Sequence, residues 1–303
     1  MNLATFRRQA DDEPRLGVVL GSSLIEVSAL GAGLPASMAG LLADWPAGLA
    51  ALHAALGSAG ASAAGRAVAL DEIEFLAPVP RPGKIVAAGV NYRSHGDEQA
   101  KAPPDHPVLF AKLPTSVIGQ GAEIRWSPEL TQAVDFEAEL AVVIGRRCRR
   151  VGEAQALDHV AGYTCLNDVS ARDLQYSDKQ FVRGKSLDTF CPMGPWLVPA
   201  GDVPDPQALR VRCLVNGVVM QDASTAEMVF SVAQLISFCS QAFTLEPGDV
   251  IATGTPAGVG WFREPKQMLK NGDEVVVEIE GIGRLANVCR EERDSADLES
   301  FDA

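Results

Sequence analysis

Basic residues are scarce in this 303-residue sequence, which has 26 Lys and Arg against 39 Asp and Glu and a formal net charge of −13. Because no basic surplus is available to neutralise phosphates, the composition argues against a nucleic-acid partner. Long apolar runs are also missing, since Gly, Pro or a charge breaks each one well before the ~20 residues that a bilayer requires. The first 16 residues carry six charges and no apolar signal core, so we expect a cytoplasmic protein without a membrane partner.

Cysteine is thinly spread, with six residues between positions 148 and 289. No two of them form a CxxC pair, and none has a histidine at zinc-finger spacing, which argues against a disulfide framework and a zinc finger. Most have apolar neighbours, as Cys165 and Cys239 do. We therefore expect reduced cysteines that are buried and structural.

The N-terminal part of the chain predicts a small α+β domain. Residues 16–30 contain two β-branched runs around a Gly-Ser-Ser turn, which predicts a hairpin. Residues 36–57 favour helix, with Pro46 as an interruption, and residues 57–65 form a small-residue stretch that we interpret as a linker. We expect three parts along the chain: a small N-terminal domain (1–75), a metal-dependent catalytic domain (76–292) and an acidic tail (293–303).

Short strands separated by Gly and Pro dominate from residue 84 onward. The expected strands are 84–90, 134–145, 160–169, 210–217, 249–254 and 273–281, with helices at 153–159 and 228–242. Because the helices do not alternate regularly with the strands, a doubly wound sheet and a (β/α)8 barrel are disfavoured. The pattern predicts a β-rich α/β fold, a mixed β roll or barrel with flanking helices.

Segment 134–145 carries an acidic face with no basic residue. In a strand, Asp135, Glu137 and Glu139 share one face, and the two glutamates lie ~7 Å apart. The opposite face is apolar and consists of Val134, Phe136, Ala138, Leu140, Val142 and Ile144. A divalent cation such as Mg²⁺, Mn²⁺ or Ca²⁺ would relieve the repulsion between the carboxylates. A solvated acidic face explains this segment equally well, so both interpretations stay open.

A third acid, Asp168, ends the apolar run before a predicted helix. A helix cap is the simpler interpretation of an aspartate in that place. Asp168, Arg172 and Gln175 nevertheless follow the i, i+4, i+7 spacing of one helix face. An acid, a guanidinium and an amide on one face would suit the edge of an anion and metal site.

Two further groups have chemical potential. His95 stands three residues before Glu98, so in a helical turn the carboxylate can orient the imidazole as a general base. Surface decoration is the simpler interpretation of this pair taken alone. Lys185, one of seven lysines, lies between Gly184 and Ser186, but Lys179 stands where a Walker A motif requires glycine. It is either an electrostatic group in a site or a salt-bridged structural lysine.

Six ordered segments together resemble the fumarylacetoacetate hydrolase family. They are NYRSHGDE (91–98), FAKLPTSVIG (110–119), VDFEAELAVVIG (134–145), LNDVSARDLQ (166–175), RGKSLDTFCPMGPW (183–196) and TGTPAGVG (253–260). The resemblance covers about residues 75–290. Within the family, the sequence is most similar to the bacterial subgroup with a short N-terminal domain, which includes diketo-acid hydrolases. It implies a β roll of the type found in the family's C-terminal domain, a homodimer, and bound Mg²⁺ or Mn²⁺.

The resemblance also assigns roles to individual residues. It implies that Glu137, Glu139 and Asp168 bind the metal, and that His95 and Glu98 activate water on a segment that closes as a lid. The residues expected around the substrate are Tyr92, Arg172, Gln175, Lys185, Gly254 and Thr255, with Lys185 also catalytic. We expect the lid and neighbouring loops, including Arg93, Trp261 and Phe262, to set specificity.

The activity implied is hydrolysis of the C–C bond of a 2,4-diketo acid, which yields pyruvate and a carboxylic acid and suits the catabolism of aromatic compounds or sugar acids. Lys185 and the cation would stabilise the departing pyruvate enolate. Decarboxylation of oxaloacetate and isomerisation or hydration of unsaturated 2-oxo diacids are the alternatives, because the same site would support them. A non-catalytic metal-binding relative is less expected, since His95, Glu98 and Lys185 are all present.

Overall fold

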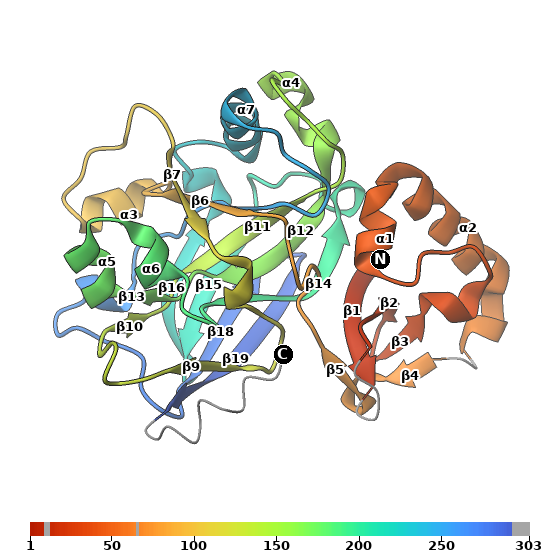
Figure 1. Cartoon of the computed structure of the whole chain (residues 1–303), viewed down its shortest axis with the longest axis horizontal. Coiled ribbons are helices and arrows are strands. Elements are labelled where there is room, and N and C mark those ends of the chain that lie inside the picture. Colours follow the sequence, from red (N-terminus) through yellow and green to blue (C-terminus); the bar gives the residue numbers. More distant parts are fainter. Residues whose placement is uncertain (9–12, 65–66, 293–303) are drawn as a thin grey trace.

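The computed structural model describes residues 1–8, 13–64 and 67–292, and a large mixed sheet runs through these residues (Figure 1). Its neighbours in order are β4 (Ala67–Ala69), β3 (Ser23–Glu26), β2 (Arg15–Leu20), β1 (Asn2–Arg8), β14 (Cys191–Pro199), β12 (Val160–Asn167), β11 (Ala138–Ile144), β17 (Val250–Ala252), β6 (Ile85–Gly89) and β7 (Val108–Lys112). Two short strands join it at the side, with β5 (Ile73–Phe75) on β1 and β8 (Val117–Ile118) on β14. Most pairs are antiparallel, whereas β17 runs parallel to β6.

A second sheet packs against one face of the first. Its strands in order are β16 (Val218–Ser224), β15 (Arg210–Val215), β18 (Glu274–Ile279), β19 (Gly283–Glu291) and β9 (Glu123–Trp126). Leu140 and Val142 of β11 share one buried cluster with Cys213 of β15 and Val277 of β18. That cluster contains every residue of the apolar face predicted for 134–145, which confirms the period-two pattern of the segment.

Helices near the N-terminus cover the other face of the large sheet (Figure 1). Leu41 of α1 (Met38–Ala43) and Trp45 of α2 (Trp45–Ala64) share a second buried cluster with Ala141 and Val143 of β11. Strand β11 is therefore buried on both faces. Glu139 lies on the same side of β11 as Ala141 and Val143 and is itself buried.

The N-terminal predictions are partly confirmed. The hairpin expected over residues 16–30 is present as β2 and β3, which pair from Gly17 with Glu26 to Leu20 with Ser23. The linker prediction for residues 57–65 is wrong over 57–64, because α2 continues to Ala64 and alanine has the highest helix propensity. Pro46 stands in the first turn of α2, where proline is tolerated, and does not interrupt it.

Strand β1 connects the N-terminal strands to the rest of the sheet. It pairs with β2 and β5 on the N-terminal side and with β14 on the other, where Leu3 stands opposite Leu197. A division between residues 1–75 and 76–292 therefore remains a proposal. The acidic tail predicted for 293–303 lies outside the described residues.

The predicted strand over 134–145 is divided into two. Strand β10 (Val134–Asp135) pairs with β13 (Ser170–Ala171), whereas β11 pairs with β12 and β17. Because the two halves have different partners, the chain leaves the ladder at residues 136–137, where the Phe136 N–H donates to Asp135 Oδ1. Glu137 therefore lies in the two-residue irregular link between β10 and β11 and not inside a strand.

The remaining α-helices of the described residues are short. They are α3 (Arg93–Glu98), α4 (Glu153–Ala156), α5 (Arg172–Asp178), α6 (Phe181–Lys185) and α7 (Val232–Ala242). The 3-10 turns are η1 (Val27–Leu30), η2 (Leu70–Glu72), η3 (Pro114–Ser116), η4 (Leu157–His159), η5 (Ala200–Asp202), η6 (Thr225–Glu227) and η7 (Gly260–Phe262). The helix expected at 228–242 begins only at Val232, because Ser231 caps it by accepting from the Gln234 N–H.

All six cysteines are free and buried, which confirms the structural role expected for them. Burial raises the pKa of the Cys239 thiol to about 12, so this side chain stays a neutral thiol. Among the helices of the described residues, none combines the length and the apolar character needed to span a membrane.

We predict that Leu197→Ala lowers the free energy of unfolding by about 2–5 kcal/mol, because it leaves a cavity where β1 and β14 join. Leu197 is fully buried in the cluster under the N-terminal helices. The measurement is urea denaturation followed by circular dichroism. Leu20→Ala is the matched control, since Leu20 is 49% exposed and its truncation should change the value by about 0.5 kcal/mol or less. Equal effects from both variants would contradict the prediction.

Candidate active site

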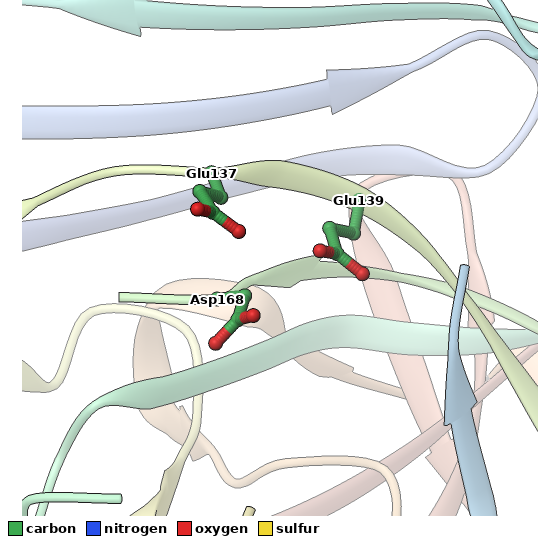
Figure 2. A group of neighbouring side chains, drawn as sticks. All are labelled: Glu137, Glu139 and Asp168. Carbon is green, nitrogen blue, oxygen red and sulfur yellow. The ribbon is translucent and has the colours of Figure 1, made fainter. Parts of the chain in front are cut away.

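Three carboxylates meet where β11 begins and β12 ends. These strands are antiparallel, and Ala138 stands opposite Asn167, so the residues beside that pair become neighbours. Glu137, Glu139 and Asp168 each offer an oxygen, and these atoms lie within 4.8 Å of one another (Figure 2). Two hydrogen bonds hold the link before β11 in place, since the Glu137 N–H donates to Asn167 Oδ1 and the Asp168 N–H donates to the Glu137 carbonyl.

The three acids are buried, with 5%, 1% and 0% of Glu137, Glu139 and Asp168 exposed. The solvated acidic face that the sequence left open is therefore wrong, because other layers cover it. The simple helix cap is wrong for Asp168 too, since the helix that follows begins only at Arg172. Charges out of water require partners.

Lys185 is the first of those partners. Its Nζ donates to Glu137 Oε2 at 2.7 Å and to Asp168 Oδ2 at 2.8 Å, so one ammonium bridges two acids of the triad. Burial lowers the pKa of Lys185, but Asp168 and Glu137 outweigh this and leave the pKa above its usual value. Lys185 is thus a fixed positive charge. It is both the salt-bridged lysine and the electrostatic group in a site that the sequence analysis gave as alternatives.

Lys112, at the end of β7, is a second partner that sequence reasoning missed. It is 1% exposed, and its Nζ donates to Asp168 Oδ1 at 2.6 Å and to the Lys185 carbonyl. It therefore fixes both the acid and the segment that carries Lys185. The sequence does hold one signal for this residue: Lys112 lies between Ala and Leu in the apolar FAKLP segment, where a solvent-exposed lysine is unusual.

Arg172 is the third buried cation. Its guanidinium contacts Glu137 Oε1 at 2.7 Å and Asp135 Oδ2 at 2.8 Å, and its Nη1 donates to Gln175 Oε1 at 3.0 Å. Gln175 lies one helical turn away on α5, so the shared helix face predicted for these two residues is present. Asp135, also missed as a site residue, is fully buried and orients the guanidinium from behind.

These contacts give the acids of the triad unlike proton affinities. Burial raises the pKa of Glu137, but Lys185 and Arg172 outweigh it and bring the pKa to about 2. Glu139 has a pKa well above its usual value, because it is buried and faces Asp168 and Glu137. Its nearest donor is the Gly254 N–H, at 2.8 Å from Oε2. Among the three acids, Glu139 is therefore the one whose charge the described cations compensate least.

His95 and Glu98 form the pair that their spacing predicts. Nδ1 of His95 lies 2.5 Å from Glu98 Oε1, and the other carboxylate oxygen accepts from the Gly258 N–H at 2.8 Å. His95 is only 6% exposed, which makes the surface-decoration interpretation wrong. Phe262 packs edge-on against the imidazole, with ring centroids 6.1 Å apart. The carboxylate fixes the ring and leaves its other nitrogen, Nε2, for chemistry.

A small cavity of about 50 Å³ unites most of these groups. The predicted residues that line it are His95, Glu137, Glu139, Arg172, Gln175, Lys185 and Thr255. Asp168 and Glu98 lie behind the lining and act on it through Lys185 and His95. The Thr255 hydroxyl donates to the Ala138 carbonyl and accepts from Gln221, a residue that the sequence analysis did not consider.

Tyr92 does not reach this cavity. It is fully buried within the core between the sheets, and its hydroxyl has no hydrogen-bond partner among the residues that the structure describes. Burial and the nearby Glu139 and Glu227 raise the pKa of Tyr92 above its usual value. Gly254 contributes only its backbone N–H to Glu139. The structure therefore gives Tyr92 a packing position, unlike the substrate contact expected for it.

Sequence comparison gives relatives along nearly the whole chain. The chain is 43% identical over 291 residues to the mitochondrial oxaloacetate tautomerase FAHD2A of Bos taurus, a match that covers 95% of this chain and 91% of the relative. It is 46% identical over 221 residues to the oxaloacetate tautomerase YisK of Bacillus subtilis, covering 72% of this chain and 73% of the relative.

Comparison with solved structures gives a further similar protein. Maleylpyruvate hydrolase from Sphingobium sp. SYK-6, solved in complex with manganese(II) ion and pyruvate, is 33% identical with a TM-score of 0.79, and the match covers 97% of this chain and all of that one. The β-rich α/β fold predicted from the sequence is thereby confirmed. The family model of the fumarylacetoacetate (FAA) hydrolase C-terminal domain matches residues 84–290. The chain therefore belongs to the fumarylacetoacetate hydrolase family.

Proposed function

We propose that this chain is a divalent-metal-dependent enzyme that interconverts the keto and enol forms of a 2-oxo acid, with oxaloacetate as the substrate supported best. One observation carries the proposal: the oriented base His95 and the cations Lys185 and Arg172 line a single small cavity. Proton transfer next to a carbonyl requires such a base together with positive charge where the enolate forms. The relatives named oxaloacetate tautomerase support this choice of substrate.

The residues fit a divalent cation. Four buried carboxylates (Asp135, Glu137, Glu139 and Asp168) stand against three buried cations (Lys112, Arg172 and Lys185), and Glu139 has no cation as a direct hydrogen-bond donor in the described contacts. Glu137, Glu139 and Asp168 would hold the ion, and carboxylate oxygens suit Mg²⁺ and Mn²⁺ alike. When bound, the cation supplies Lewis-acid polarisation of the substrate's keto oxygen.

The chain's own residues then supply the proton chemistry. His95 takes a proton from the carbon beside the keto group, and Glu98 stabilises the imidazolium that results. The electron pair of the broken C–H bond forms the C=C bond, and the carbonyl π pair moves to the keto oxygen. The His95 imidazolium then gives up its proton to that oxygen, so the base is regenerated and the product is an isomer of the substrate. Lys185 and Arg172 provide the positive charge that favours an anionic 2-oxo acid and its enolate.

Hydrolysis of the C–C bond of a 2,4-diketo acid is the second candidate. It is favoured by the same His95–Glu98 pair, which can take a proton from water as readily as from carbon. The likeness to maleylpyruvate hydrolase supports it. Decarboxylation of oxaloacetate also passes through an enolate, but it needs no base and leaves His95 without a task.

The reactions are separated by two assays on one preparation with Mg²⁺ or Mn²⁺. The decay of enol-oxaloacetate is followed by ultraviolet absorbance, and pyruvate is followed with a coupled dehydrogenase. Faster ketonisation without pyruvate release supports the tautomerase. Release of pyruvate from acetylpyruvate would show that the enzyme is a hydrolase and not a tautomerase. Release of pyruvate from oxaloacetate would show that it is a decarboxylase.

We predict that Glu139→Gln weakens Mn²⁺ binding on the order of 100-fold or more, because it removes one charged ligand and outer partners alone already contribute 10–100-fold. The glutamine can still accept the Gly254 N–H, so the fold is kept. Titration calorimetry with MnCl₂ measures the affinity, and EDTA should abolish wild-type activity. Glu246→Gln, at an exposed ion pair, is the control. Unchanged Mn²⁺ affinity in Glu139→Gln would remove the metal site from the proposal.

Replacing the base tests the proton transfer directly. His95→Ala should lower kcat for oxaloacetate tautomerisation by about 10²–10⁴-fold, the usual contribution of a positioned general base. Mn²⁺ affinity should stay at the wild-type value, since His95 is not in the acid triad. A variant that loses metal together with activity would show that the roles are misassigned.

Lys112 provides a test of the buried charge pairing. Lys112→Met leaves Asp168 Oδ1 and the Lys185 carbonyl without their donor, which should cost about 3–5 kcal/mol of unfolding free energy. Mn²⁺ affinity should fall on the order of 10–100-fold, because Asp168 loses its orientation. Lys270→Met is the matched control, since Lys270 is exposed. A stable Lys112→Met protein with wild-type affinity would contradict the positioning role.

A further inference from the structure

A second cavity opens directly outside the first. It measures about 310 Å³ against about 50 Å³ for the inner one, and Gln99, Lys101, Tyr176, Trp261 and Phe262 line it. All of these except Trp261 also line the inner cavity, so the two spaces are continuous. A substrate that is anchored at the acid triad and is too long for the inner cavity therefore has room in the outer space.

The outer cavity has flat aromatic walls. The rings of Tyr176 and Trp261 stack with centroids 5.4 Å apart and planes at 27°, although Tyr176 remains 45% exposed. Lys266 Nζ lies 3.2 Å from the centre of the Trp261 ring and holds one of its faces by a cation–π contact. Phe262 contributes a third ring, which also packs against His95. None of the residues that line this cavity is acidic.

These walls are fixed to the chemical site by a buried contact. Asp135 accepts from the backbone N–H groups of Gly260 and Trp261, at 2.7 and 3.0 Å, and it also contacts the Arg172 guanidinium. The turn that carries Trp261 and Phe262 is thus held by the same carboxylate that orients the guanidinium. A rigid aromatic surface at a set place beside the reacting centre is typical of a specificity subsite.

We infer that this outer cavity is a subsite for a flat apolar group, and that aryl-substituted 2-oxo acids are a substrate class of the enzyme. The inference rests on the proposed function, because the 2-oxo acid end must bind at the acid triad. An aromatic ring on the carbon beside the keto group would leave the inner cavity past His95 and pack against the stacked Tyr176–Trp261 pair and Phe262, which line the outer space. Oxaloacetate has no group that uses these rings, whereas stacking favours an aromatic substituent.

The test compares phenylpyruvate with oxaloacetate on the Mn²⁺-loaded full chain. The wild type should accelerate ketonisation of both enols. Trp261→Ala should lower the ratio of kcat/KM for phenylpyruvate to that for oxaloacetate roughly tenfold, the size of one aromatic stacking contact. Trp261→Phe keeps a flat ring and should retain most of the ratio. Leu20→Ala, an exposed truncation in β2, is the control and should leave the ratio unchanged.

Binding is measured alongside turnover so that two failures can be told apart. Calorimetric titration of phenylpyruvate into the Mn²⁺-loaded protein should show about tenfold weaker binding in Trp261→Ala than in the wild type. If no enol reacts but this difference appears, the tautomerase proposal fails and the subsite stands. If oxaloacetate reacts while phenylpyruvate neither reacts nor binds, or if Trp261→Ala changes neither ratio nor affinity, the subsite is overturned.

Discussion

The buried charge cluster around Glu137 is the interaction on which the rest of this site depends. Lys185 and Arg172 both contact that carboxylate, and Lys112 extends the cluster by pairing with Asp168. Charges removed from water are tolerated only when each has a close partner, so the elements that carry them have little freedom to move apart. The cluster thereby ties β7, α5 and α6 to the junction of β11 and β12, and the inner cavity forms at this junction.

Layering explains how so many charges are kept from solvent. Strand β11 packs on the second sheet by one face, and residues of its other face share a buried cluster with the N-terminal helices, so both faces of the strand are kept from water. Burial and like charges then act together on Glu139 and raise its pKa, whereas the neighbouring cations lower that of Glu137. Two acids two residues apart thus differ in proton affinity, a difference typical of groups that perform chemistry.

Asp135 connects the inner chemistry to the outer cavity. One carboxylate orients Arg172 and also accepts from the turn that carries Trp261 and Phe262. The sequence analysis placed Asp135 on the acidic face but gave it no role, because nothing local indicates that residues more than a hundred positions away donate to it. Lys112 escaped attention for the same reason, since its partners Asp168 and the Lys185 carbonyl are distant in the chain.

Local patterns alone determined the apolar face of segment 134–145, the hairpin of β2 and β3 and the His95–Glu98 pair, because each depends on residues a few positions apart. Tertiary structure decided whether the acidic face met water, where Tyr92 pointed and which cation served which acid. These outcomes depend on which layers cover a face and which distant strands become neighbours. Composition and hydrophobic periodicity do not show which layer will cover a face or which distant strands will pair, because both are properties of the assembled sheets and not of the single segment.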